Sequence, residues 1–308
     1  MVTIPQTSLT VYPLCLGANV FGWSADESQS REVLDAFLGL GGNFIDTADV
    51  YSEWKDGNVG GESETIIGNW MKSRGNRHSV VVATKVSKLS TRPGLSAQNI
   101  IAACEDSLRR LQTDHIDIYY AHDDDPNTPL SETLEAFTQL MKSGKVSYIA
   151  SSNYSPERLT EALKVSQENN FAAYIGAQNM YNLLERNRYE NGMAQVIAEN
   201  HLSCIPYFGL ARGFLTGKYQ PGVTVESVRA GGVASYKNET GWKTVSALEK
   251  LAKEHKSSVS SIALAWLRAQ PTVSVPIASA RTVEQLEEIM QLVELNADEI
   301  ALLSKITA

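Results

Sequence analysis

Cysteine is scarce in this 308-residue chain, which has only Cys15, Cys104 and Cys204. Three widely separated cysteines in apolar surroundings argue against a disulfide framework and against a zinc cluster. Free cysteines of this kind are usually buried as small apolar side chains. We therefore expect three free, buried thiols. None has a basic partner nearby in the sequence, so none is expected to act as a nucleophile.

An excess of positive charge and a long apolar run are also missing. Lys and Arg number 27 against 35 Asp and Glu, so the formal net charge is -8, which argues against nucleic acid or an anionic membrane as the main partner. No uncharged apolar run approaches the roughly 20 residues that cross a bilayer. Residues 1–5 lack the basic and apolar segments of a signal peptide. These absences predict a cytoplasmic protein whose partner is a small molecule.

No linker, charge run, low-complexity stretch or internal repeat divides the chain. Its composition, 43% hydrophobic and 20% charged, is that of a soluble globular protein. The length permits one large α/β domain or two ordinary ones. Because the same alternation of short apolar runs and amphipathic stretches continues along almost the whole sequence, we expect a single domain spanning residues 1–308.

Eight short apolar runs have the pattern of β-strands, and helical stretches lie between them. Repeated strand–helix units favour a parallel sheet, and eight of them favour a closed (β/α)8 TIM barrel over an open sheet. The helical stretches carry start signals, for example Ser96 as an N-cap, and Ser155 before a first-turn Pro156. The expected strands are Leu14–Gly17, Asn43–Thr47, Val80–Lys85, Ile116–His122, Val146–Ser151, Ala173–Gln178, Ser203–Tyr207 and Val273–Ile277.

Two segments depart from the plain strand–helix unit. The apolar run Ser8–Val11 is expected to form a short N-terminal hairpin with the first strand and to close the bottom of the barrel. A long segment after strand seven exceeds one loop and one helix, and its part from Gly209 to Gly241 is rich in glycine and polar residues. Two helices, Trp242–His255 and Val259–Ala269, are expected after this long loop.

Polar side chains fall at the ends of three consecutive strands. Asp46 and Tyr51 follow the second strand, Lys85 ends the third, and His122 follows the fourth. Each has an ordinary structural explanation when taken alone, but the carboxyl ends of parallel strands share one rim, so the four are expected in one cleft. A phenol with its usual pKa of about 10 is a poor acid at neutral pH. An adjacent ammonium held by a carboxylate would lower that pKa, which predicts a proton-transfer site suited to carbonyl reduction.

The three segments that contain these residues, 43–51, 83–86 and 117–122, resemble in order and spacing the tetrad segments of the aldo-keto reductase family. The resemblance implies a (β/α)8 barrel without a metal that uses NADPH (NADP+) without a Rossmann domain. The Gly-rich dinucleotide fingerprint is indeed absent. The resemblance also implies reduction of a small aldehyde or ketone to an alcohol. Tyr51 would then be the general acid, Lys85 and Asp46 would assist it, and His122 would position the carbonyl.

Cofactor-binding residues are expected at the later strand ends. Side-chain amides donate and accept at once, as the nicotinamide carboxamide requires, and Ser152, Asn153 and Gln178 match family positions that hold it. By the same resemblance, Tyr207 stacks on the nicotinamide ring, and Arg281 holds the 2′-phosphate, so NADPH is expected over NADH. The other residues that the resemblance assigns are Gly209, Leu210, Arg212, Gly213 and Lys218 for the pyrophosphate, and Ser279, Gln285 and Glu288 for the 2′-phosphate and adenine.

The substrate pocket is expected to be lined by Phe21, Trp23, Trp54 and Asp123, all in loops after barrel strands. Aromatic walls suit a flat or sugar-like carbonyl compound, although loop aromatics are as often packing residues. The sequence does not identify the aldehyde or ketone. We expect a monomer.

Three other interpretations stay open. His122 and the three aspartates after it, with Asp46, resemble a metal site of a barrel hydrolase, but such sites usually draw histidines from several strands. Related barrels serve as cofactor-binding, redox-sensing regulatory subunits of membrane channels. An NADP-dependent alcohol dehydrogenase, working in the oxidative direction, would use the same residues as a carbonyl reductase.

Overall fold

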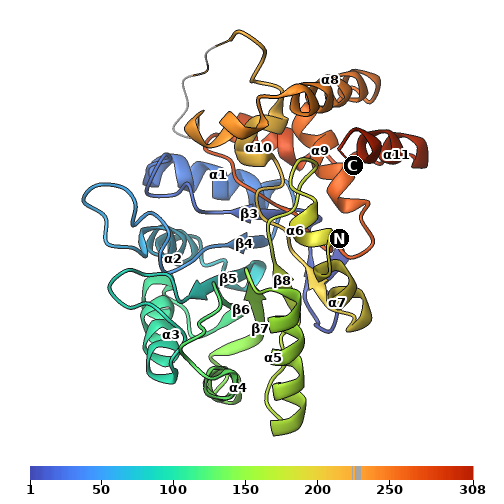
Figure 1. Cartoon of the computed structure of the whole chain (residues 1–308). Helices are drawn as coiled ribbons and strands as arrows, with labels where there is room; N and C mark the ends of the chain where they lie inside the picture. The colour runs from blue at the N-terminus through green and yellow to red at the C-terminus, as the bar shows by residue number, and fades with distance from the viewer. Residues whose placement is uncertain (224, 226–229, 308) are drawn as a thin grey trace.

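A closed sheet of eight parallel strands forms the centre of the molecule, and helices surround it (Figure 1). The computed structural model describes residues 1–223, 225 and 230–307. Strand–helix repeats produce this arrangement because neighbouring parallel strands need a crossover connection, which the helix supplies. The strands of the barrel are β3 (Cys15–Gly17), β4 (Phe44–Asp46), β5 (Val81–Val86), β6 (Ile116–Ala121), β7 (Val146–Ser152), β8 (Gly176–Gln178), β9 (Ser203–Cys204) and β10 (Ile277–Ala278).

The barrel closes between β9 and β10. Every other neighbouring pair around the sheet is a parallel ladder, including β10 with β3. At the last junction Cys204 bridges Val273, and the Ile277 amide donates to the Pro206 carbonyl at 2.9 Å. The predicted (β/α)8 barrel is therefore confirmed. Strand β9 is shorter than the predicted Ser203–Tyr207, and β10 begins at Ile277, where the predicted strand Val273–Ile277 ends, because Pro206 and Pro276 have no amide hydrogen to contribute to a ladder.

The helices begin where the sequence signals predict. Ser96 accepts a hydrogen bond from the Asn99 amide, and Ser155 accepts one from the Arg158 amide with Pro156 in the first turn, so both expected N-caps are confirmed. The helices are α1 (Glu27–Gly39), α2 (Glu62–Arg74), α3 (Ala97–Leu111), α4 (Leu130–Lys142), α5 (Pro156–Asn169), α6 (Asn187–Glu190), α7 (Met193–Glu199), α8 (Glu239–Glu254), α9 (Val259–Arg268), α10 (Val283–Met290) and α11 (Ala297–Ile306).

The strands are buried on both faces because each alternates between two apolar layers. Val82 packs in the layer between the sheet and the helices, whereas its neighbours Val81 and Ala83 belong to a cluster that fills the barrel interior. Strands β5 and β6 are buried along their whole length, which explains their continuous apolar runs. The same alternation turns Lys85 of β5 toward the barrel interior.

The N-terminal hairpin differs from the prediction in its partner. Strand β2 (Thr10–Val11) pairs antiparallel with β1 (Val2–Thr3) and not with the first barrel strand. Both edges of β3 are already paired, with β4 and with β10, so no edge remains for a hairpin. Ile4 and Val11 are nevertheless fully buried in the interior cluster, so the hairpin packs against the inside of the barrel.

The long segment after β9 contains the expected loop and the two expected helices, α8 and α9. Two 3-10 helices, Ala211–Thr216 and Ala230–Tyr236, lie in the loop, and the first packs against α8 and α9. Residues 224 and 226–229 of the predicted loop lie outside the described residues. The beginning of the segment therefore lies at the carboxyl end of β9, where the sequence predicted it.

All three cysteines are free and buried, as predicted. Within the described part of the chain, no helix is both long enough and apolar enough to cross a membrane. Nor does any group of three or more His, Cys, Asp and Glu side chains in residues 1–223, 225 and 230–307 have the arrangement of a metal site.

Candidate active site

Strands β4 and β5 bring a carboxylate, an ammonium and a phenol into direct contact. Asp46 ends β4, Lys85 lies in β5, and Tyr51 lies in the turn that follows β4. The Lys85 ammonium donates to Asp46 Oδ2 at 2.6 Å, to Tyr51 Oη at 2.9 Å and to the Thr47 carbonyl at 2.7 Å. All three of its N–H donors are used, so this fully buried cation is completely hydrogen-bonded.

The Tyr51 hydroxyl lies between two groups of opposite charge. It accepts a hydrogen bond from Lys85 and donates one to Asp46 Oδ2 at 3.2 Å. The other oxygen of Asp46 accepts from Nε2 of Gln178, at the end of β8, at 2.8 Å. His122 follows β6, and its ring lies edge-on to that of Tyr51, with the two ring centres 6.0 Å apart. The four predicted tetrad residues are therefore neighbours in one cluster.

Burial and charge determine where the protons of this cluster reside. Burial lowers the pKa of Lys85, and the Asp46 carboxylate offsets part of that effect. Burial raises the pKa of Tyr51 well above its usual value, and the Asp46 carboxylate raises it further. The prediction that Lys85 lowers the pKa of Tyr51 is therefore wrong for the protein without ligand. The adjacent Asp46 carboxylate counteracts the ammonium, and burial removes the phenol from water. At neutral pH the phenol keeps its proton.

The His122 imidazole is uncharged at neutral pH. Burial lowers its pKa well below the usual value, and the ammonium groups of Lys85 and Lys88 lower it further. Its Nδ1 is buried and has no hydrogen-bond partner among the described residues. A neutral imidazole has one donor and one acceptor nitrogen, so His122 can hydrogen-bond a polar ligand without adding charge.

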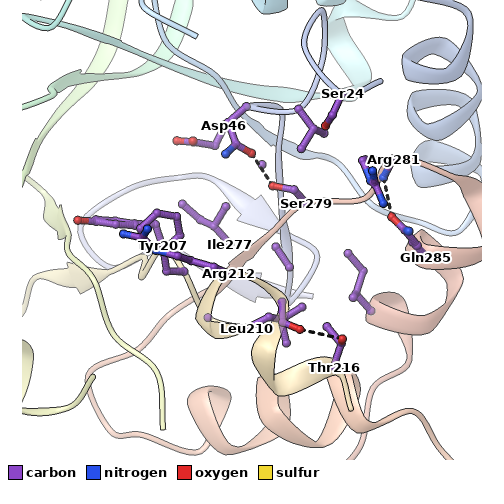
Figure 2. A pocket seen from close by; sticks show the side chains of 18 of the residues that line it. Ser24, Asp46, Tyr207, Leu210, Arg212, Thr216, Ile277, Ser279, Arg281 and Gln285 are labelled. Atoms are coloured by element: carbon purple, nitrogen blue, oxygen red, sulfur yellow. Dashed lines mark hydrogen bonds between the residues drawn. The ribbon is translucent and has the colours of Figure 1, made fainter. Parts of the chain in front are cut away.

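The cluster opens into a cavity of about 810 Å³ at the carboxyl ends of the strands. Figure 2 shows Asp46 and Tyr207 on one side of this cavity and Arg281 and Gln285 on the other. In (β/α)8 barrels this end is where ligands bind. The predicted site residues that line the cavity are Asp46, Tyr51, Trp54, His122, Ser152, Asn153, Gln178, Tyr207, Gly209, Leu210, Arg212, Gly213, Lys218, Ser279, Arg281, Gln285 and Glu288.

A hydrogen-bonded group from β7, β8 and the loop after β9 lies beside the tetrad. Ser152 Oγ donates to the Gln178 carbonyl at 2.9 Å, and Tyr207 Oη donates to Asn153 Oδ1 at 2.7 Å. Asn153 has a φ of 59°, in the left-handed region that asparagine tolerates better than most residues. The side-chain Nδ2 of Asn153 donates to the backbone carbonyl of His122 at 2.9 Å. These bonds fix amide and phenol groups next to the predicted proton donor.

The loop after β9 brings two cationic side chains to the cavity. The Arg212 guanidinium lies 4.9 Å from the centre of the Phe208 ring. Its Nε is buried and has no hydrogen-bond partner among the residues that the structure describes. Gly213 has a φ of 93°, and a Cβ there would lie 3.3 Å from Lys218 Nζ. Glycine thus allows both the turn and the close approach of the lysine.

Helix α10 presents one face to the cavity. Gln285, Glu288 and Ile289 are spaced three and four residues apart and all line it. Just before the helix, the Arg281 amide donates to Gln285 Oε1 at 3.0 Å (Figure 2). The first turn of a helix carries partial positive charge, so α10 and Arg281 together create an end of the cavity suited to an anion.

Three of the four predicted substrate-pocket residues lie at or behind the cavity wall. Trp54 lines the cavity and is 48% exposed, and its ring contacts that of Trp23 edge-on at 5.7 Å. Asp123 forms an ion pair at 3.0 Å with Lys88, which lines the cavity. Trp23 and Asp123 therefore support lining residues without being lining residues themselves.

Phe21 requires a correction, because it does not line the cavity. It is fully buried in the apolar core between the sheet and the helices. The chain turns tightly here, with the Phe21 amide donating to the Ala18 carbonyl at 3.1 Å, and the ring packs into the core. Its apolar surface is better buried there than against a wet pocket.

The part of the cavity wall that β3 and the loop after it form was not predicted from the sequence. Gly17, Asn19, Val20 and Ser24 all line the cavity. Ser279 Oγ donates to Asn19 Oδ1 at 2.7 Å, and a Cβ on Gly17 would lie only 2.8 Å from that hydroxyl. The rule that placed polar residues at the later strand ends applies equally to the first strand, so the signal was present.

Nearly the whole chain matches one known protein family. The model of the aldo/keto reductase family matches residues 13–308. The chain belongs to the aldo/keto reductase family. It is similar to "Uncharacterized oxidoreductase YrpG" of Bacillus subtilis, with 37% identity over 305 residues, or 95% of this chain and 90% of that protein. "Protein tas" of Escherichia coli is 32% identical over 324 residues, or 96% and 93% of the two chains.

A further relative carries a name of another kind. The "Putative voltage-gated potassium channel subunit beta" of Schizosaccharomyces pombe is 32% identical over 282 residues, which cover 87% of this aldo/keto reductase chain and 80% of that protein. Relatives at similar identity are thus named both as an oxidoreductase and as a channel subunit. The choice between these two roles for this chain must therefore be argued from the geometry of its site.

Aldo/keto reductases generally use NAD(P)H and act on small carbonyl compounds. The side chains around the cavity fit such a dinucleotide, because amides and an aromatic ring lie beside the tetrad, and cations and a helix N-terminus line the other part. The buried, unpartnered Nε of Arg212 is a donor that an anionic group would satisfy.

Proposed function

We propose that this aldo/keto reductase catalyses the NADPH-dependent reduction of an aldehyde or ketone to an alcohol. The observation that carries the proposal is the buried Asp46–Lys85–Tyr51 cluster at the floor of a cavity of about 810 Å³. In the reaction the carbonyl carbon gains a hydride, the carbonyl oxygen gains a proton, and NADPH becomes NADP+. Bound NADPH supplies the hydride, and the chain supplies the proton and the geometry.

Tyr51 is the proposed proton donor. Its high pKa keeps the hydroxyl protonated until negative charge develops on the carbonyl oxygen. As the proton leaves, the phenolate forms 2.9 Å from the Lys85 ammonium, and the hydrogen bond between them strengthens because both partners are then charged. The proposed role of Lys85 is therefore to stabilise the product of proton transfer. Asp46 keeps that ammonium charged and in place at 2.6 Å.

His122 is the proposed positioning group for the carbonyl. It lines the cavity, and its ring lies beside that of Tyr51. Because burial holds its pKa low, the ring is neutral and does not compete with Tyr51 as an acid. A neutral N–H directed at the carbonyl oxygen would orient it toward the phenol.

The proposed cofactor seat uses the residues predicted from the sequence. Ser152, Asn153 and Gln178 would bind the carboxamide, and Tyr207 would stack on the nicotinamide ring. The loop with Gly209, Leu210, Arg212, Gly213 and Lys218 would bind the pyrophosphate. The segment with Ser279, Arg281, Gln285 and Glu288 would bind the 2′-phosphate and adenine. The support for this assignment is that all thirteen residues line one cavity together with Asp46, Tyr51 and His122.

The decisive experiment compares Tyr51→Phe with the unchanged protein on a panel of aldehydes and ketones, following NADPH absorbance. We expect kcat to fall by at least about 100-fold, because the general acid is lost while the ring remains. Binding of NADPH, measured by fluorescence titration, should stay within about two-fold, which shows that the variant is folded. Full activity of Tyr51→Phe would overturn the assignment.

Two alternatives have support in the family. A channel-type regulatory role is prompted by the relative of that name, and reduction of simple aldehydes at ordinary turnover would argue against it. Alcohol oxidation with NADP+ would use the same groups in reverse, with the Tyr51 phenolate as base. The direction is set largely by the cellular ratio of NADPH to NADP+, so net turnover of one carbonyl–alcohol pair, measured at physiological ratios of the two cofactors and fixed pH, separates the two directions.

A further inference from the structure

Lys88 is a cation of the cavity wall to which the proposed reaction assigns no role. Among the described residues that line the cavity, the other cationic side chains are Arg212, Lys218 and Arg281, all in segments proposed to hold the dinucleotide. Lys88 comes from the loop after β5, which neighbours β4, the strand that precedes Tyr51 and Trp54. Its ammonium lies 3.0 Å from Asp123 Oδ2.

The loop that carries Lys88 is anchored to the loop that carries Trp54. The Ser90 amide donates to Glu53 Oε1 at 3.2 Å, and the Ser90 hydroxyl also donates to that carboxylate. The Gly94 amide donates to the Ser87 carbonyl at 2.9 Å, which closes the loop on itself. The two loops that carry the ammonium and the indole are therefore joined to each other.

The backbone before Lys88 is strained. Ser87 has a φ of 124°, in a region that L residues rarely adopt, and its side chain is 7% exposed. Such a conformation persists only where the surrounding contacts impose it. Here it turns the chain between Lys85, at the floor of the cavity, and Lys88, on its wall. Strain of this kind concentrates at sites that bind ligands.

Stabilisation of the fold by the Lys88–Asp123 ion pair does not explain why a strained turn places Lys88 on the cavity wall. The two side chains are 38% and 44% exposed, and pairs of that exposure contribute little to folding. Lys88 lines the cavity and Asp123 does not, so an anionic ligand in the cavity reaches the ammonium directly and competes with Asp123 for it. The field of Lys88 also reaches His122, whose pKa it helps to lower. An anionic group on the substrate would gain a charge-assisted hydrogen bond here.

We propose that Lys88 selects carbonyl substrates that carry a carboxylate, joined to the carbonyl by a flat spacer that packs against Trp54. The inference rests on the proposed function. The carboxylate is unchanged in the reaction, since the hydride goes to the carbonyl carbon and the proton to its oxygen, and only NADPH is oxidised. Lys88 is a specificity residue and does not touch the reacting atoms.

The test measures kcat/KM for 3- and 4-carboxybenzaldehyde and for their methyl esters, which share ring and carbonyl but lack the charge. The unchanged protein should prefer the acids, and Lys88→Met should lower the acid-to-ester ratio at least about ten-fold, mainly through KM. Asp123→Asn should raise that ratio, because it frees the ammonium from its partner. Lys243→Met, on the exposed face of α8, should leave the ratio unchanged.

A second readout separates this inference from the proposed function. Calorimetric titration with 4-methylbenzoate, which has neither a carbonyl nor an alcohol to react, in the presence of NADP+ should give at least about ten-fold weaker binding for Lys88→Met than for the unchanged protein. An acid-to-ester ratio that Lys88→Met does not move, with equal binding of the benzoate, overturns the role of Lys88. If the unchanged protein reduces no member of the aldehyde and ketone panel, the proposed function fails, and the titration alone decides on Lys88. If it reduces other members of the panel but neither of the two acids, the role of Lys88 fails while the proposed function stands.

Discussion

At the scale of single residues, the site shows that the pKa of a side chain depends strongly on its burial and on the charges around it. Lys85 and Asp46 form a buried ion pair, and such pairs rarely stabilise a fold beyond what apolar residues would do. The pair instead places an ammonium 2.9 Å from the Tyr51 hydroxyl. The buried pair is therefore explained by the proposed proton transfer better than by a contribution to folding.

Asp49, two residues before Tyr51, is a second buried carboxylate with unusual properties. It is 1% exposed, and neither carboxylate oxygen has a hydrogen-bond partner among the described residues. Burial, and then the nearby Glu64 carboxylate, raise its pKa to about 7, while Arg110 and Arg92 oppose the rise. Between about pH 4 and pH 7 the folded protein thus holds a proton that the unfolded chain has lost.

This proton makes stability depend on pH with a known sign. Because the folded state binds the extra proton, Asp49 makes the protein less stable as pH rises from about 4 to 7, by up to about 1.4 kcal/mol per pH unit. In Asp49→Asn this contribution is absent. The unfolding free energy of the unchanged protein, relative to the variant, should therefore fall between pH 5 and pH 7.5 in urea titrations. Asp56→Asn, on an exposed loop, is the control, and parallel profiles for Asp49→Asn would contradict the prediction.

At the scale of elements, α2 and α3 approach closely because of a glycine. A Cβ on Gly68 of α2 would lie 2.1 Å from the Arg110 carbonyl oxygen and 2.8 Å from the Leu111 Cα, both in α3. Main-chain atoms in a helix cannot move aside cheaply. The two helices are also joined by an ion pair, since Arg110 of α3 donates to Glu64 of α2 at 2.6 Å.

Gly68→Ala is expected to destabilise the protein by about 1–3 kcal/mol, because the added methyl forces the two helices apart. Gly39→Ala, in α1, is a matched control, since a Cβ there meets nothing within 4 Å. That change should be neutral or stabilising by about 0.5–1 kcal/mol, as alanine suits a helix better than glycine. Chemical unfolding of both variants measures the difference. Equal stability of the two would show that α2 and α3 can separate without cost.

At the scale of the whole molecule, the cavity joins nearly all the strand ends of the barrel, from β3 to β10. A ligand that fills it links elements distant in sequence, so its binding should stabilise the entire fold. Linkage predicts about 2.7 kcal/mol of stabilisation at a ligand concentration of 100 Kd. The proposed cofactor should therefore be visible in thermal unfolding without any substrate.

NADP+ should raise the melting temperature more than NAD+ at equal concentration if Arg281 pairs with the 2′-phosphate as proposed. Arg281→Ala should bring the NADP+ shift down to that of NAD+, and should raise the KM for NADPH at least about ten-fold. Arg109→Ala, on the exposed face of α3, should keep the full NADP+ shift. An unchanged KM for NADPH in Arg281→Ala would remove the 2′-phosphate assignment.

Much of the architecture was predictable because it depends on local patterns. Strands and capped helices, such as the helices that start after Ser96 and Ser155, can be recognised from residues close together in the sequence. Eight repeats of one strand–helix unit are compatible with only a few folds. The hairpin partner was not predictable in this way. It depends on which edges of β3 remain unpaired, and β10 occupies one of them from the far end of the chain.

By itself the sequence determined the barrel, and it placed an acid, a phenol, an amine and an imidazole at neighbouring strand ends, because strand order and side-chain period are local properties. Only the tertiary structure decided the charge states of that group, the burial of Phe21 in the core and the position of Lys88 on the cavity wall. These depend on desolvation and on electric fields, which arise from residues far apart in the chain and adjacent only after folding.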